Sequence, residues 1–400
     1  MKKLIVLTST FPRWEKDSTP SFVMHFCQAI QKHMKILVLT PHYKGAKQRE
    51  IIQEIRIKRY RYWPIQSGEN IVGGGAAIGK IKKTPLYAFK LLFLLISLFI
   101  NTLSLSIKNR AVINAHWIVP QGFIAVLVKH FTGARVVVTV HGGDIFSLNH
   151  SLIRKIKLFT LKKADVVVVN STSTKKACQE IYKREYEIIP MGVDTEKFSK
   201  PDIKAVEIIK KKYKLKSFTV IFIGRLSEEK GVIFLIDALE KLKEEGKEFK
   251  ALIVGDGSEK NRLRKAIEEK GLQSKVIMTG WIDSEEISSY YACSSVFVGP
   301  SIVSKTGWRE AFGLVFAESL ASGTPVIGTK TGGIQDIVVN GVNGYLVNEK
   351  DADAIFERLN ELMEKPELLR SMQSNASKSV DKFSWKYTVK NYLKVFNSLL

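Results

Sequence analysis

The sequence has little of what builds a disulfide framework or a metal centre. It holds three cysteines in 400 residues, Cys27, Cys178 and Cys293, which lie far apart and lack the spacing of metal ligands. This pattern is typical of reduced thiols in a cytosolic protein rather than of a secreted, disulfide-linked fold. No stretch is low in complexity and 45% of the residues are hydrophobic, so we expect a folded chain of two or three domains.

Acidic residues are scarce relative to basic ones. The chain has 62 Lys and Arg against 39 Asp and Glu, a net charge of +23, and residues 31–90 hold thirteen Lys and Arg against three Glu. A cationic first half attracts nucleic acid, an acidic polymer or the cytoplasmic face of a membrane, or is a solvated surface without a partner. Charge by itself does not choose among these.

Long apolar runs are absent with one exception, residues 86–107. A helix that spans a bilayer needs about 20 apolar residues, and Lys90, Asn101 and several hydroxyl side chains dilute this run. We expect first a buried or half-buried helix of a domain, next a helix in contact with a membrane surface, and last a span. The apolar start of the chain is too short for a secretory signal and predicts a first buried strand.

Short apolar runs alternate with helical patterns along the chain, which predicts α/β units with parallel sheets. The expected strands are 3–8, 35–39, 111–115, 135–140, 165–169 and 187–189 in the first half, and 218–223, 251–254, 276–278, 296–298 and 326–327 in the second. The expected helices are 21–32, 121–131, 172–182, 231–244, 259–269, 284–292 and 314–321.

Residues 192–201 carry turn-forming residues without periodicity and are expected to be a linker. The chain then forms two doubly wound, Rossmann-like domains, 1–195 and 205–380, which face a central cleft where ligands bind beyond the carboxyl ends of the strands. The segment 383–400 predicts an amphipathic helix whose aromatic side chains cover a surface, for which the first domain is one candidate.

Two carboxylates eight positions apart, Glu310 and Glu318, flank a glycine and apolar residues. If a helix begins near Gly313, its free N–H groups form an anion site, with Glu310 in the loop before it and Glu318 on the helix behind. Carboxylates accept hydrogen bonds from the hydroxyls of a sugar or a ribose. Two surface glutamates on an amphipathic helix are the alternative.

Two cations follow the first expected strand of the second half, Arg225 directly after Gly224, and Lys230. Together they can hold a pyrophosphate, although such residues near strand ends are usually only solvated. Gly280 and Trp281 follow a later strand and can line a base pocket, whereas a core position is the more common role of a tryptophan.

His141 ends a strand of the first half and precedes two glycines, which suits a loop that meets a ligand as well as a structural role. Asp144 can orient the imidazole or bind a substrate hydroxyl, and His116 ends the preceding strand. Asp351 and Asp353 resemble the Asp-x-Asp signature of metal-dependent sugar transferases, but capping of a late helix explains them better. We expect no metal site.

In this order the motifs resemble the family 4 glycosyltransferases, which have the GT-B fold. The resemblance is strongest from 218 to 346 and rests on Arg225, Lys230, Gly280-Trp281, the Glu-x7-Glu of 310–318, Gly323-Thr-Pro-Val, Thr331-Gly-Gly-Ile, Asn340-Gly-Val-Asn-Gly and His141-Gly-Gly-Asp144. It implies a retaining, metal-independent hexosyltransferase that needs no cofactor, with an acceptor-binding first domain and a donor-binding second domain.

By the same resemblance, Arg225 and Lys230 hold the diphosphate of a nucleotide-sugar, Glu310 contacts the sugar, Glu318 the ribose, and His141 lies beside the reacting sugar. The implied donor site also contains Gly224, Gly280, Trp281, Phe312, Gly313, Leu314 and Val315. Family members often carry a Gly-Gly loop after the first strand, which is absent here; Ser18, Thr19 or Ser21 are candidates to replace it. The expected acceptor or cleft residues are Asp144, His116, Ser18 and Thr19.

The favoured interpretation is transfer to a lipid-linked or membrane-held acceptor in the synthesis of a cell-surface polysaccharide or glycoconjugate. The expected partners are a nucleotide-sugar, a lipid-linked or saccharide acceptor and an anionic membrane surface, with the enzyme in the cytoplasm on the inner face of the membrane. A transferase with a soluble acceptor and a sugar-nucleotide epimerase share the motifs. No nucleic-acid-binding module is recognised, which disfavours a basic nucleic-acid-binding protein.

Overall fold

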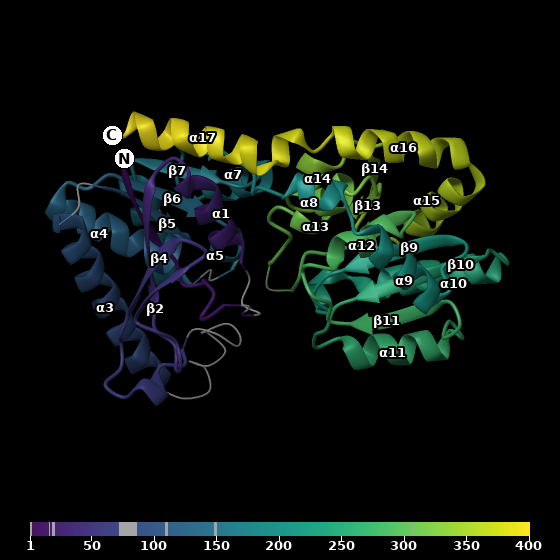
Figure 1. The fold of residues 1–400 in the computed structure, drawn as a ribbon, viewed down its shortest axis with the longest axis horizontal. Helices are drawn as coiled ribbons and strands as arrows, with labels where there is room; N and C mark the ends of the chain where they lie inside the picture. The colour runs from purple at the N-terminus through teal and green to yellow at the C-terminus, as the bar shows by residue number, and fades with distance from the viewer. Residues whose placement is uncertain are drawn as a thin grey trace. The chain divides into compact units, whose positions relative to one another are not determined.

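Two separate parallel sheets organise the chain in the computed structural model (Figure 1). The structure describes residues 2–15, 17, 21–71, 86–108, 111–147, 150–305 and 307–400. Each sheet belongs to a compact unit: unit 1 comprises Met1–Asn170, Thr174–Ile189 and Thr388–Leu400, and unit 2 comprises Ser171–Ser173 and Pro190–Tyr387. The chain thus has the two Rossmann-like α/β domains expected from the sequence.

Unit 1 is built on a sheet in the order β3-β4-β2-β1-β5-β6-β7-β8, in which every neighbouring pair is parallel except β3 and β4. Its strands are β1 Lys3–Leu7, β2 Lys35–Pro41, β3 Arg49–Ile52, β4 Ile55–Tyr60, β5 Val112–His116, β6 Val136–Val140, β7 Val166–Val169 and β8 Glu187–Ile188. All residues of β5 and β6 are buried, because continuous apolar strands of a parallel sheet pack on both faces.

The hairpin of β3 and β4 was not expected from the sequence. Its strands mix isoleucines with arginines and lysines, as suits the edge of a sheet rather than its centre. Its turn is Gln53-Glu54, whose φ angles of 47° and 66° are positive without any glycine. The Asn-Gly or Asp-Gly signal that usually marks such a turn is therefore missing.

The helices that join the strands of unit 1 are α1 Phe22–Gln31, α3 Leu86–Lys108, α4 Phe123–Thr132, α5 Gly143–Phe146, α6 Ser151–Lys163 and α7 Thr172–Gln179. The apolar helix α3 packs on α4, β2 and β4 through one face that includes Leu94, Leu98 and Leu105. Its other face is exposed, so the half-buried interpretation fits better than the fully buried one.

The last helix, α17, runs from Trp385 to Ser398, and its residues from Thr388 onward belong to unit 1. Tyr392 and Phe396 of α17 are buried there, with the Tyr392 ring 4.8 Å from that of Phe26 in α1. The Lys2 ammonium donates to the Asn397 side chain at 3.0 Å, so both ends of the chain lie in unit 1 (Figure 1).

Unit 2 is built on a fully parallel sheet in the order β11-β10-β9-β12-β13-β14. Its strands are β9 Phe218–Ile223, β10 Phe249–Val254, β11 Val276–Gly280, β12 Val296–Gly299, β13 Val326–Thr329 and β14 Gly344–Val347. Its helices are α8 Thr195–Ser199, α9 Ile203–Tyr213, α10 Val232–Glu244, α11 Lys260–Glu269, α12 Ile287–Ala292, α13 Leu314–Ala321, α14 Ile334–Ile337, α15 Ala352–Glu364 and α16 Pro366–Lys378.

The first strand of unit 2, β9, lies in the middle of its sheet. The chain adds β10 and β11 on one side of β9 and then crosses to β12, β13 and β14 on the other. Such a reversal opens a crevice at the carboxyl ends of β9 and β12, where open α/β sheets bind ligands. The expected linker is part of this unit: it contains the short helix α8, which the Asp194 side chain caps.

Candidate active site

The loops that follow β9 and β12 bring two predicted residues together at this crevice. Lys230 lies in the loop after β9 and Glu310 in the loop after β12. The Lys230 ammonium is 2.5 Å from a Glu310 carboxylate oxygen, and both side chains are mostly buried. The same ammonium lies 5.5 Å from the centre of the Trp308 ring. Two residues that are eighty positions apart in the sequence thus form a charge-assisted hydrogen bond between mostly buried side chains.

Close backbone packing fixes the loop that carries Glu310. The Gly333 N–H donates to the Glu310 carbonyl at 3.0 Å. Gly332 has a φ of 53°, and a Cβ added there would lie 1.7 Å from the same carbonyl oxygen. Only glycine fits this position, because both the backbone angle and the available space exclude a side chain. The Thr331-Gly-Gly-Ile motif therefore supports the Glu310 loop from β13.

Helix α13 begins at Leu314, directly after Gly313, whose φ of 92° lies in the left-handed region. This is the helix start expected from the sequence. The first backbone N–H groups of α13 have no carbonyl partner within the helix. Phe312, which lies just before the helix, is buried. The tip of α13 thus presents backbone donors next to the Glu310 loop, as an anion site requires.

Glu318 lies on α13, one and a half turns behind the tip. Burial raises the pKa of Glu318 to about 7, while the charge of Lys197 and a hydrogen bond with the Tyr291 hydroxyl oppose the shift. The Tyr291 hydroxyl also lies 3.1 Å from the Val315 carbonyl oxygen. A carboxyl that titrates near neutrality changes between acceptor and donor there, so its environment is unlike that of a surface glutamate.

Arg225 and Trp281 are exposed. Arg225 follows Gly224 at the end of β9, and within the described ranges its guanidinium has no ion-pair partner. Trp281 follows Gly280 at the end of β11 and is 66% exposed, so it is not a core tryptophan. Both side chains stand at the carboxyl edge of the sheet, where a ligand can reach them.

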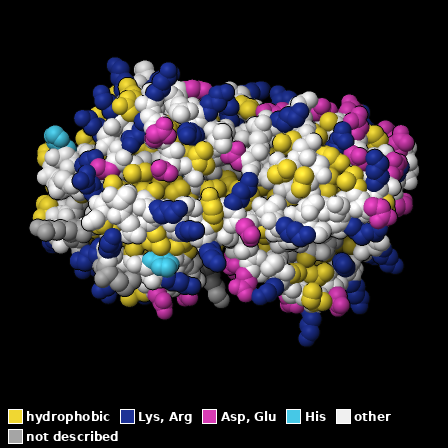
Figure 2. All heavy atoms as spheres, turned by 90° about the horizontal axis from the view of Figure 1, so that it is seen from above, with side chains coloured by type: hydrophobic (Ala, Val, Ile, Leu, Met, Phe, Trp, Pro, Cys, Tyr) yellow, Lys and Arg dark blue, Asp and Glu magenta, His cyan; other side chains and the backbone are white. Residues whose placement is uncertain are grey.

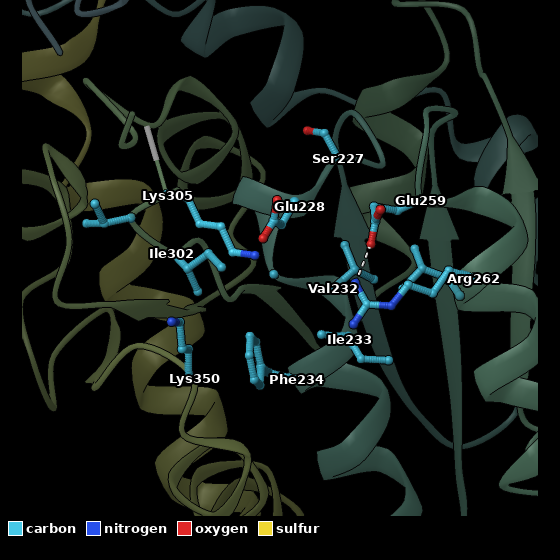
Figure 3. A pocket seen from close by; sticks show the side chains of 13 residues that line it. Ser227, Glu228, Val232, Ile233, Phe234, Glu259, Arg262, Ile302, Lys305 and Lys350 are labelled. Atoms are coloured by element: carbon cyan, nitrogen blue, oxygen red, sulfur yellow. Dashed lines mark hydrogen bonds and ion pairs between the residues drawn. The ribbon is translucent and has the colours of Figure 1, made fainter. Parts of the chain in front are cut away.

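A pocket of about 230 Å³ lies beside the loop after β9 (Figure 3). Ser227 and Glu228 line one side, and Lys305 and Lys350 approach from another. Across the pocket Arg262 forms an ion pair with Glu259. None of the predicted site residues lines this pocket, and no sequence motif pointed to it, because its walls come from four separate segments.

In unit 1, His141 follows β6 and meets His116 and Trp117 at the end of β5 and Phe22 at the start of α1. Its Nε2 is 2.8 Å from Nδ1 of His116, which ends β5, and the two imidazoles stack with ring centres 5.1 Å apart. The rings of Phe22 and Trp117 each lie 5.0 Å from the His141 ring. Burial lowers the pKa of His141 to about 3 and that of His116 well below its usual value, so both are neutral at pH 7.

Asp144 is buried, and its carboxylate accepts hydrogen bonds from main-chain N–H groups rather than from an imidazole. One carboxylate oxygen accepts the N–H of Ile118 at 2.7 Å, and the other accepts those of Gly142 at 3.0 Å and His141 at 3.3 Å. These bonds fix the loops after β5 and β6 against each other. Asp144 therefore sets where His141 lies through the main chain.

The remaining predictions concern metal and the loop after β1. Asp351 accepts the Ala354 N–H at 2.9 Å and caps α15, so helix capping explains the Asp-x-Asp pattern. Within the described residues, no group of three or more His, Cys, Asp and Glu side chains is placed to hold a metal ion.

Ser18 and Thr19 lie outside the described residues. Ser21 precedes α1, with its hydroxyl 3.4 Å from the His25 ring.

Comparisons with known proteins match both halves of the chain. The family profile "Glycosyltransferase Family 4" matches residues 20–197, and "Glycosyl transferases group 1" matches residues 205–379. The chain is 28% identical to the N-acetyl-alpha-D-glucosaminyl L-malate synthase of Bacillus anthracis over 305 residues, 73% of this chain and 76% of that protein.

Two further similarities concern a second enzyme and a solved structure. The chain is 27% identical to the GDP-mannose-dependent alpha-(1-6)-phosphatidylinositol monomannoside mannosyltransferase of Mycolicibacterium smegmatis, over 67% of this chain and 71% of that one. Its fold resembles the crystal structure of Anabaena HepE in complex with UDP, with a TM-score of 0.77, 19% identity and full coverage of both chains.

Proposed function

The chain belongs to the family 4 glycosyltransferases and has the GT-B fold, and on that basis we propose that it moves a hexose-type sugar from a nucleoside-diphosphate sugar to a lipid-linked or membrane-held acceptor. The transfer retains the anomeric configuration, needs no metal, and serves the synthesis of a cell-surface polysaccharide or glycoconjugate. Among its relatives, the mycobacterial mannosyltransferase acts on a phosphatidylinositol monomannoside.

The observation that carries the donor site is the Lys230–Glu310 pair at the crevice of unit 2. An ammonium, the exposed guanidinium of Arg225 and the tip of α13 supply the positive field that a diphosphate needs. Glu310 lies within reach of the same ammonium and offers acceptor oxygens for sugar hydroxyls. Trp281 offers an exposed ring for a base.

In the proposed reaction the bond between the anomeric carbon and the diphosphate oxygen breaks, and its electron pair leaves with the nucleoside diphosphate. The acceptor hydroxyl forms the new carbon–oxygen bond on the same face, and its proton passes to the departing diphosphate. Lys230 and Arg225 stabilise the negative charge that develops on the leaving group. His141 is neutral at pH 7 and therefore contributes a hydrogen bond rather than a charge or a proton.

The experiment on the donor combines binding with turnover. Nucleotide-sugars of different base and sugar are screened for a rise in melting temperature, because a ligand of the native state stabilises it. The best donor is then incubated with acceptor extracts and without acceptor. Transfer that depends on acceptor supports the proposal, whereas isomerisation of the donor by itself identifies an epimerase, and no stabilising donor contradicts it.

The exposed face of α3 supports the membrane-held acceptor. Leu86, Phe89, Leu92, Phe93, Ile96, Ile100 and Ile107 are each between 45% and 70% exposed along this helix. By length and hydropathy α3 resembles a membrane-crossing helix, and its apolar window is 22% buried. Lys and Arg side chains are spread over the face of the molecule shown in Figure 2. Next to α3, Arg49, Arg56, Lys58 and Lys108 line one hollow together with Leu105. An apolar face amid cations suits the surface of an anionic membrane.

We therefore propose a peripheral enzyme on the cytoplasmic face of the cell membrane. Sedimentation with vesicles of anionic lipid is expected to capture the chain, and Phe89→Ser with Phe93→Ser to reduce that capture severalfold. The matched control is Ile203→Ser with Ile208→Ser, which removes two residues of α9 that are about 65% exposed. Equal capture of both double variants, or none of the wild type, contradicts the membrane assignment.

A further inference from the structure

A chain of buried hydrogen bonds connects the C-terminal helix to His141 within unit 1. The Tyr392 hydroxyl lies 3.2 Å from the Thr139 hydroxyl, which donates to the Asn114 side-chain oxygen at 3.0 Å. The Asn114 amide lies 3.3 Å from Nε2 of His116, and His116 Nδ1 lies 2.8 Å from His141 Nε2. Four elements, α17, β6, β5 and the loop after β6, thus contribute to one series.

Water has no access to the links of this series. Tyr392, Thr139, Asn114 and His116 are each at most 1% exposed. Every link must therefore have one donor and one acceptor among these groups, because an unpaired buried donor is costly. Since an imidazole that is neutral carries one N–H, the direction of each link determines the direction of the next.

Only two directions are possible along the whole series. In one, Tyr392 donates to Thr139, Thr139 to Asn114, Asn114 to His116, and His116 to His141. In the other the Asn114 amide is turned over and every bond is reversed. The second direction makes the Tyr392 hydroxyl an acceptor of the Thr139 proton and leaves its own O–H without a partner among the described residues.

The hydroxyl of Thr139 therefore decides between the two directions. In the first direction its O–H has an acceptor in the Asn114 side-chain oxygen, and the phenol has an acceptor in Thr139. In the second direction Thr139 accepts from the Asn114 amide, and the two hydroxyls have only each other as acceptors, so one O–H stays unpaired. A buried O–H without a partner costs about 1–3 kcal/mol, which favours the first direction roughly fivefold or more.

We propose that Thr139, Asn114 and His116 are positioning residues that hold His141 as the Nδ1–H tautomer. His141 Nε2 then accepts from His116, and Nδ1 carries the proton. The described residues provide no hydrogen-bond partner for Nδ1, and the half-buried ring leaves it accessible. The Nδ1–H group of His141 is then available to donate a hydrogen bond to an oxygen of the sugar. This last step rests on the role of His141 in the proposed function.

The test reads the tautomer directly, by ¹⁵N NMR of the full chain with labelled histidine and no ligand. The His141 signals are assigned from their loss in His141→Gln. In the wild type we expect a protonated Nδ1 and an unprotonated Nε2. Thr139→Val keeps the shape of the side chain but removes its hydroxyl, so that either direction leaves one polar group of Asn114 unpaired, and the two tautomers should approach equal populations, a shift of roughly fivefold or more in their ratio.

The matched control is Tyr392→Phe, at the end of the same series. It keeps the ring packed on Phe26 and leaves Thr139 bonded to Asn114. In the reversed direction the Thr139 O–H would still have no acceptor in the series, so we expect the wild-type tautomer. Tyr186→Phe is a second control for the loss of a buried phenol, because the Tyr186 hydroxyl lies 2.7 Å from the Tyr182 carbonyl oxygen and 3.2 Å from that of Cys178, apart from the series.

Two results would overturn the proposal: a wild-type His141 protonated on Nε2, or tautomers that Thr139→Val leaves unchanged in folded protein. The NMR result stands whether or not the chain transfers sugar, so it is separate from the proposed function. If transfer is established, equal tautomers leave about half of the molecules competent, and kcat of Thr139→Val should fall about twofold at unchanged KM. Tyr186→Phe should keep the wild-type kcat.

Discussion

The two units position their site residues by opposite electrostatic means. Unit 2 brings full charges together: Lys230 and Glu310 form an ion pair at the crevice beside the exposed Arg225. In unit 1 the site residues are uncharged: His116 is buried, His141 is half-buried, and the two neutral imidazoles are joined by a hydrogen bond. The difference matches two tasks of the proposed transfer, since a leaving diphosphate needs a positive field and a reacting sugar needs a fixed hydrogen bond.

The largest effect is expected from removing the carboxylate of the charged pair. Glu310→Ala should lower kcat/KM for sugar transfer by about 10²–10³-fold, because in the proposed reaction Glu310 contacts the sugar and its ion pair holds Lys230 beside the donor. Glu364→Ala is the control: Glu364 pairs with Lys247 at 2.6 Å near the amino ends of the strands of the same sheet. Activity within twofold of wild type in folded Glu310→Ala would remove the pair from the site.

A smaller loss is expected in unit 1. His141→Ala removes one neutral hydrogen bond and should lower kcat by about 10²-fold, while the exposed His33→Ala should leave it unchanged. Because burial lowers the pKa of His141 to about 3, its protonation should add no inflection to the pH–rate profile between pH 5 and 8. An inflection in that range that disappears in His141→Ala would show that His141 is charged during turnover.

The smallest effect concerns the pH dependence of stability in unit 2. The pKa of Glu318 is raised from 4.5 to about 7, so the folded state binds more protons than the unfolded state between these values. The free energy of unfolding should therefore fall as pH rises from 4.5 to 7, and Glu318→Gln should lack about 1–2 kcal/mol of that fall.

Urea unfolding at pH 4.5, 6 and 8 measures this difference between Glu318→Gln and the wild type. The control is Glu269→Gln on α11, an exposed glutamate that pairs with Lys265 on the surface. Parallel stability curves for wild type and Glu318→Gln would show that Glu318 is not held as a raised acid.

The sequence predicted most strands of both units and fewer of their helices. The bounds of β9 and α13 agree with the expected ones, because each is a clear apolar or helical pattern that begins or ends at a glycine. In unit 1 the hairpin β3–β4 went unpredicted, since charged strands and a turn without glycine give no pattern, and in unit 2 β14, α9 and α16 went unpredicted. Helix α3 is half-buried, which lies within the expectation of a buried or half-buried helix.

The sequence motifs identified the residues of the candidate site but not which of them are in contact. The Glu-x7-Glu spacing and the helix start at Gly313 were visible in the sequence, whereas the pairing of Glu310 with Lys230 was not. Asp144 could be placed beside His141, yet its bonds to the main chain are a property of the fold. Asn114, Thr139 and Tyr392 had no signal, because an ordinary core strand or helix contains such residues.

By itself, the sequence determined the class of fold, the family and the residue types at the carboxyl edges of the strands, since these depend on local patterns and ordered motifs. Only the tertiary structure decided which of those residues meet. The topology of unit 2 brings the loops after β9 and β12 to one crevice. Packing of α17 on unit 1 places a phenol at the end of a hydrogen-bond series. Burial, which arises only in the folded chain, sets the protonation of His141 and Glu318.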